Sequence, residues 1–206
     1  MIALSSKSAA LRFHNLLLLI ARRLTFASGV VLLGVVAVTC LSILGRSLSG
    51  FLTSPFADTN FPTVANTLLA LGIGPIRGDY ELVEAGVAFC IAAFLPYCIL
   101  TQSHAIVSVV TERLRPATQQ ALKLLADLLL AIGFTIIAIQ LVSGTISKFL
   151  AGQTTFLLEL PVWTAYALCS AGLMTSAICA WWLVIARLLE TFGHDPIMAD
   201  FREVDT

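Results

Sequence analysis

Four apolar stretches, each long enough to cross a lipid bilayer, constrain this chain more than any other feature of its sequence. A helix rises about 1.5 Å per residue, so about 20 apolar residues cross a hydrocarbon core about 30 Å thick. Pro96 interrupts the second stretch and predicts a kink near its end. The sequence therefore predicts an all-α integral membrane protein with four transmembrane helices, over residues 24–45, 82–100, 121–142 and 161–186.

Composition and charge support this class. Only 12% of the residues are charged and 58% are hydrophobic, whereas soluble domains have about one quarter charged residues. The formal net charge is zero, so it favours no nucleic-acid partner. All five cysteines lie inside apolar runs and are expected to be small buried side chains, with no disulfide framework, metal site or cofactor. They are Cys40, Cys90, Cys98, Cys169 and Cys179.

The segments outside the spans divide the chain into three parts. Residues 1–23 form an N-terminal amphipathic segment, residues 24–189 a four-helix membrane domain, and residues 190–206 a solvated acidic tail. Within the first part, residues 8–23 are expected either to lie along the membrane surface or to form the first half of one long helix that continues into the span. Residues 105–114 give a second amphipathic surface helix.

The basic residues set the expected orientation, because positive charge accumulates on the cytoplasmic side of membrane proteins. With four spans, the two termini and the connection after the second span share one side. That side holds nine of the twelve basic residues, and the other side holds only Arg46, Arg77 and Lys148. Both termini are therefore expected in the cytoplasm.

The spans lack the groups that move a polar solute. A self-sufficient carrier usually has ionisable groups at mid-membrane depth or broken helices that coordinate the substrate, and here the charges cluster near the span ends. Two structural features stand out instead. Arg46 is expected to pair with Glu84 between the first two spans. Small residues at a spacing of four predict a close helix contact through Gly172, Ser176 and Ala180.

An enzyme is the weakest of the functions considered. Glu81 and Glu84 lie one turn apart and could act as a pair of acids, and His104 follows the second span. The other two histidines, His14 and His194, lie in separate segments, and no nucleophile motif or phosphate loop is present. The sequence predicts no catalytic residue.

Four loose patterns in a fixed order resemble a known family. The first span ends in Leu44-Gly45-Arg46, and the second begins with GDYELVE at residues 78–84. The patterns continue with FLPYCILTQSHAIVSVVTERL at residues 94–114 and PVWTAYALCSAGLMTSA at residues 161–177. This arrangement resembles the small membrane subunit, the DctQ-like small permease, of tripartite ATP-independent periplasmic (TRAP) transporters. Ser108 departs from the pattern, since the family often has an acid there.

The resemblance implies a small permease in the bacterial inner membrane. It would be a scaffold for a large membrane subunit that carries the ion and substrate sites. A periplasmic binding protein would deliver an organic acid, and an ion gradient would drive uptake. Membrane lipid would surround the scaffold, and residues 47–80 would help to receive the binding protein. The alternative is a stand-alone homo-oligomeric carrier, in which Gln140 and the Gly172 face assemble a pathway between copies.

Overall fold

The computed structural model describes residues 2–54, 78–101 and 116–193, and also the single positions 63, 67, 72, 74 and 76. Side chains are described from residue 10 onward, except at residues 116–118 and 190–193. The predicted surface helix at 105–114, with His104 and Ser108, lies outside these residues. So do Arg77, His194 and most of the tail and of the 47–80 connection.

The described chain is helical. Its helices are α1 (Ile2–Leu52), α4 (Asp79–Leu100), α6 (Pro116–Leu150) and α7 (Val162–Gly193). All four are long and apolar enough to cross a membrane, so the predicted class of all-α membrane protein with four spans is confirmed. Within the described ranges, strand-like pairing is limited to one isolated bridge between Thr154 and Pro161, in the hairpin that joins α6 to α7.

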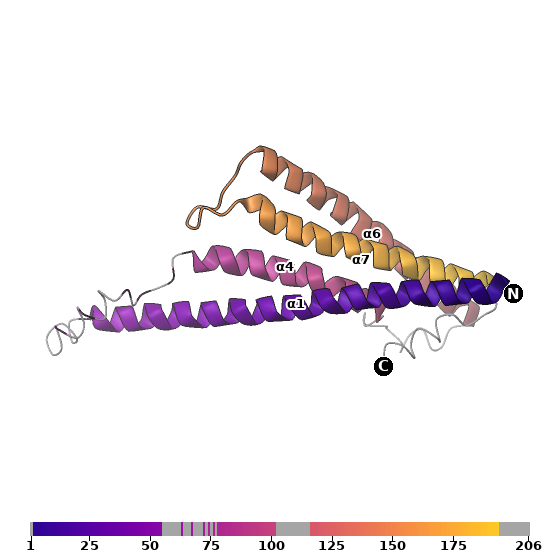
Figure 1. Cartoon of the computed structure of the whole chain (residues 1–206), viewed down its shortest axis with the longest axis horizontal. Coiled ribbons are helices and arrows are strands. Elements are labelled where there is room, and N and C mark those ends of the chain that lie inside the picture. Colours follow the sequence, from indigo (N-terminus) through magenta and orange to yellow (C-terminus); the bar gives the residue numbers. More distant parts are fainter. Residues whose placement is uncertain are drawn as a thin grey trace.

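The four helices run alternately up and down and contact one another in the order α1, α4, α7, α6. Figure 1 shows that they fan apart from one end to the other, with α1 and α6 as the two outer helices. We call the end where α1 begins and α7 finishes the converging end. The other, where α1 finishes and α4 begins, is the open end.

Helix α1 is much longer than its predicted span. It runs unbroken for 51 residues, or roughly 76 Å at about 1.5 Å per residue. Residues 8–23 therefore follow the second of the two alternatives and form the first part of one long helix, not a separate surface helix. The physical reason is local, since no glycine or proline occurs before Gly29 to end a helix.

The other helices also extend past their predicted spans. The reason is that the apolar residues that define a span are not the residues that end a helix. Helix α6 continues to Leu150 and ends before Gly152, whose φ of 59° is left-handed. Helix α4 begins after Gly78, whose φ is 79°. Such positive φ angles suit glycine and terminate regular helix. Apolarity marks the membrane boundary, and these glycines mark the helix ends.

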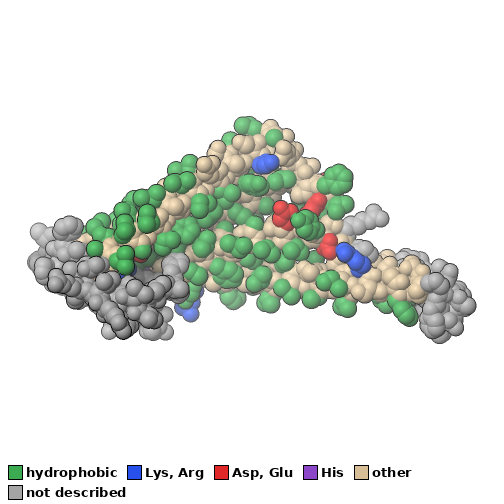
Figure 2. All heavy atoms as spheres, turned by 180° about the vertical axis from the view of Figure 1, so that it is seen from behind, with side chains coloured by type: hydrophobic (Ala, Val, Ile, Leu, Met, Phe, Trp, Pro, Cys, Tyr) green, Lys and Arg blue, Asp and Glu red, His purple; other side chains and the backbone are tan. Residues whose placement is uncertain are grey.

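Alanine and cysteine make up much of the core, as is common where membrane helices pack closely. Its main cluster lies toward the converging end and comprises Leu17, Ala21, Ile99, Leu100, Ala131, Cys179, Ala180, Leu183 and Val184. Large apolar side chains point outward along all four helices. Figure 2 shows them covering one side of the molecule, with few charged side chains among them. The interior is apolar as in a soluble protein, but the outer surface is apolar too, as expected for helices that face lipid.

Candidate functional site

At the open end, an acid at the start of α4 connects that helix to α1. Ser42, fully buried on α1, donates a hydrogen bond to Asp79 Oδ2. Arg46 Nη2 lies 4.0 Å from the same oxygen. The structure thus pairs Arg46 with Asp79, not with the predicted Glu84, which is exposed. Glu84 lies five positions after Asp79, so it is rotated about 140° from Asp79 around the helix.

A second acid on α4 holds the hairpin between α6 and α7. The backbone N–H groups of Leu157 and Leu158 donate to the two carboxylate oxygens of Glu81, at 2.7 and 3.0 Å. Gly78 lies under the hairpin, and a Cβ there would be 2.6 Å from Leu158 Cγ. At the hairpin tip, Phe156 is 95% exposed. Both carboxylate oxygens of Glu81 therefore accept hydrogen bonds from the hairpin backbone.

The two acids considered for catalysis differ in their contacts. Glu81 binds the hairpin backbone, and Glu84 is exposed. Within the ranges 2–54, 78–101 and 116–193, no three His, Cys, Asp or Glu side chains gather in a way that could hold a metal ion.

The predicted small-residue face lies against α4. A Cβ at Gly172 would be 2.8 Å from the backbone oxygen of Ala92. Ser176 and Ala180 on the same face are buried, and Ser176 donates its hydroxyl hydrogen to Gly172 O at 3.0 Å. This face is therefore covered by α4 of the same chain. The carrier alternative requires that the face be free to contact another copy, and it is not. Gln140, the other residue of that alternative, is exposed on α6.

Helix α4 makes a similarly close contact on its other side. A Cβ at Gly86 would overlap Val35 on α1. Further along the same seam, the thiol of Cys90 donates to Ser28 O at 3.2 Å. Glycine and small polar residues thus let α4 approach both neighbours closely.

Near the converging end, an ion pair joins α6 to α7. Arg187 Nε lies 2.9 Å from Asp127 Oδ2, and the two side chains are 13% and 19% exposed. Lys123, one turn before Asp127 on the same helix, is exposed. A usable signal was present: two isolated, opposite charges lie near the same end of consecutive antiparallel helices.

A buried histidine marks the contact between α1 and α7. His14 is fully buried, although its polarity interrupts the apolar pattern of residues 8–23. Trp182 Nε1 donates toward His14 Nδ1 at 3.4 Å. Phe13 packs edge-on against the Trp182 ring, with centroids 4.8 Å apart. These contacts join the first part of α1 to the last part of α7.

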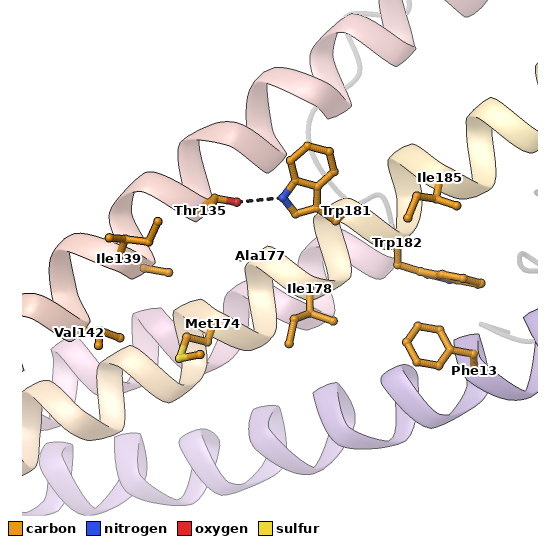
Figure 3. A pocket seen from close by; sticks show the side chains of 11 residues that line it. Phe13, Thr135, Ile139, Val142, Met174, Ala177, Ile178, Trp181, Trp182 and Ile185 are labelled. Atoms are coloured by element: carbon orange, nitrogen blue, oxygen red, sulfur yellow. Dashed lines mark hydrogen bonds between the residues drawn. The ribbon is translucent and has the colours of Figure 1, made fainter.

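An apolar groove of about 590 Å³ opens alongside α7. Figure 3 shows α6 on one side and Phe13 of α1 on the other, with the α7 side chains between. Its polar lining group is the Thr135 hydroxyl, which accepts a hydrogen bond from Trp181 Nε1 at 2.9 Å. Hydrocarbon or apolar side chains fit such a lining. An organic acid would find no cation there to bind its carboxylate.

Comparison with known proteins gives one family. The family model described as "Tripartite ATP-independent periplasmic transporters, DctQ component" matches residues 35–192, well over half of the chain. No curated protein and no solved structure matches the chain.

Proposed function

Because the chain belongs to the family of the DctQ component of tripartite ATP-independent periplasmic transporters, we propose that it is the scaffold for a large membrane subunit. The large subunit carries the substrate and ion sites. A periplasmic binding protein delivers an organic acid, and an ion gradient drives its uptake. The family match over residues 35–192 is the observation that carries this proposal.

The geometry of the described helices supports a scaffold. Small residues pack α4 tightly between α1 and α7, and an ion pair ties α6 to α7. The helices are therefore linked as one body. Their outward surfaces carry large apolar side chains that a second membrane protein or lipid can cover. Among the described residues, none that lines the groove along α7 is charged, which agrees with a substrate site on another subunit.

The scaffold would sit in the bacterial inner membrane with both termini in the cytoplasm. The open end then faces the periplasm, where the 47–80 connection and the 151–161 hairpin lie. We propose that this end contributes to the surface that receives the binding protein. Glu81 supports such a role, since it holds the hairpin with Phe156 outward.

Co-purification tests the proposal. The chain, tagged at its C-terminus, is extracted from its native membrane in mild detergent. Recovery of a larger hydrophobic protein in a fixed ratio supports the scaffold. Recovery of the chain alone or only with itself contradicts it, as does organic-acid uptake by liposomes that contain this chain alone.

A further inference from the structure

The arginines of the described chain fall into two groups. Arg46 and Arg187 each lie beside a carboxylate, at 4.0 and 2.9 Å. Arg12, Arg22 and Arg23 lie in the first half of α1 and are all exposed. No acidic side chain among the described residues forms an ion pair with any of these three. Among the described arginines, those without a carboxylate partner are therefore concentrated on one segment of one helix.

These arginines point away from the rest of the protein. On the opposite side of the helix, His14, Leu17 and Ala21 are buried against α4 and α7. At about 100° per residue, Arg12 and Arg23 lie on nearly the opposite side from Ala21, and Arg22 lies on its flank.

Apolar side chains lie between and beside the arginines on the same outward surface. Leu16 is 52%, Leu19 56% and Phe26 76% exposed. We call the surface formed by Arg12, Leu16, Leu19, Arg22, Arg23 and Phe26 the α1 basic face. Cations interleaved with exposed apolar groups are typical of helix surfaces at the boundary between water and lipid.

The packing partners set the depth of this face. Leu17 and Ala21 share a cluster with Ile99 and Leu100, the last residues of α4, the shortest of the four helices. On α1 itself, the uncharged stretch 24–45 follows directly after Arg23. It is roughly 33 Å long, enough for the hydrocarbon core. Arg22 and Arg23 thus lie where the acyl chains meet the headgroups, on the side that the basic residues assign to the cytoplasm.

We propose that the α1 basic face binds anionic phospholipid of the cytoplasmic leaflet. Charge complementarity selects the ligand, because the guanidinium groups of Arg22 and Arg23, which have no carboxylate partner among the described residues, lie at the layer of lipid phosphates. Guanidinium donors match phosphate oxygens in paired hydrogen bonds. Phe26, on the hydrocarbon side of these arginines, would contact the upper acyl chain. Each arginine near the membrane surface strengthens anionic lipid binding by about fivefold.

The test compares lipids on the isolated full-length chain. The purified protein is titrated with phosphatidylglycerol or phosphatidylcholine of the same acyl chains, and bound lipid is counted by native mass spectrometry. We expect a preference for phosphatidylglycerol. It should fall roughly 25-fold in the variant Arg22→Gln/Arg23→Gln, about fivefold for each arginine removed. The matched control is Lys123→Gln, which removes an exposed cation from α6 near the same end and should leave the preference unchanged.

Two results overturn the proposal: an unchanged chain with no preference for phosphatidylglycerol, or a control variant that loses as much preference as the arginine variant. A variant that misfolds could lose lipid binding for an unrelated reason, so a second measurement uses the unchanged chain. Phosphatidylglycerol retention by the unchanged chain should fall as salt rises from about 0.05 to about 0.5 M, and retention that ignores salt also overturns the proposal. The large subunit is absent from these tests, so their outcome is independent of the scaffold function.

Discussion

The two ends of the molecule are held together in different ways. At the open end, Asp79 and Glu81 bind a serine hydroxyl, an arginine and backbone N–H groups, all at the mouth of the helices. At the converging end, an ion pair and a histidine lie among packed helices beside the main apolar cluster. At the converging end, buried side chains hold the helices together. At the open end, polar contacts mainly fix the hairpin and the start of α4.

The largest expected effect comes from breaking the ion pair between α6 and α7. Asp127→Ala leaves Arg187 largely buried without its carboxylate. Loss of one partner of a buried pair typically costs about 3–5 kcal/mol, and because both side chains keep some exposure we expect about 3 kcal/mol. Denaturant unfolding of the purified chain in detergent measures it. The exchange Asp127→Arg/Arg187→Asp should recover part of the loss, and no recovery at all would contradict a role for the pair.

A second prediction tests the seam between α4 and α7, which connects the two ends. In Gly172→Ala the new methyl group would lie 2.8 Å from Ala92 O, so the helices must move apart. We expect a loss of about 2 kcal/mol in unfolding free energy, as for other overpacked contacts. The matched control is Gly133→Ala on α6, where nothing lies within 4 Å of the added group. That substitution should be neutral or stabilise the helix by about 0.5–1 kcal/mol.

The same substitution at the two ends sharpens the comparison. Trp182→Phe removes the indole N–H that faces His14, and we expect it to cost about 1 kcal/mol. Trp163→Phe at the open end should cost less, because its indole N–H forms no hydrogen bond with the described residues, while its edge-on contact with Phe149 can persist. Thermal unfolding of the two variants decides the order. Equal losses would show that ring size, not the hydrogen bond, matters.

The smallest global effect is expected at the hairpin. Glu81→Ala removes both acceptors of the Leu157 and Leu158 amides, so these amides should exchange with solvent faster while the unfolding midpoint stays almost unchanged. Hydrogen exchange read by mass spectrometry measures this. Glu84→Ala is the control and should leave hairpin exchange as it was. A large drop in the unfolding midpoint of Glu81→Ala would contradict the contrast between the two ends.

Sequence reasoning located the four membrane-crossing helices because span length and apolarity depend on the bilayer, not on the neighbours. It also identified the small residues at Gly172, Ser176 and Ala180. It could not choose the partner of Arg46, because periodicity gives the direction of a side chain and not which helix lies opposite. For the same reason it could not name Arg187 on α7 as the partner of Asp127.

His14 illustrates a further limit. In a segment considered alone, a histidine among leucines interrupts an apolar surface, and residues 8–23 therefore look like a helix with an imperfect lipid face. In the structure that position is fully buried, with Trp182 supplying a donor. The pattern was correct for a helix, but burial depended on Trp182 of α7, which lies 168 residues further along the chain.

The order in which the helices contact one another has a geometric consequence. Four helices arranged as a closed ring surround a central axis. The helices here form a single row in the order α1, α4, α7, α6, which spreads toward the open end. Among the described residues, such a row has two broad sides and encloses no lumen. One copy of this arrangement can wall off or brace a neighbouring protein along the height of a membrane, but any conduit for solute must be bounded on its far side by something else.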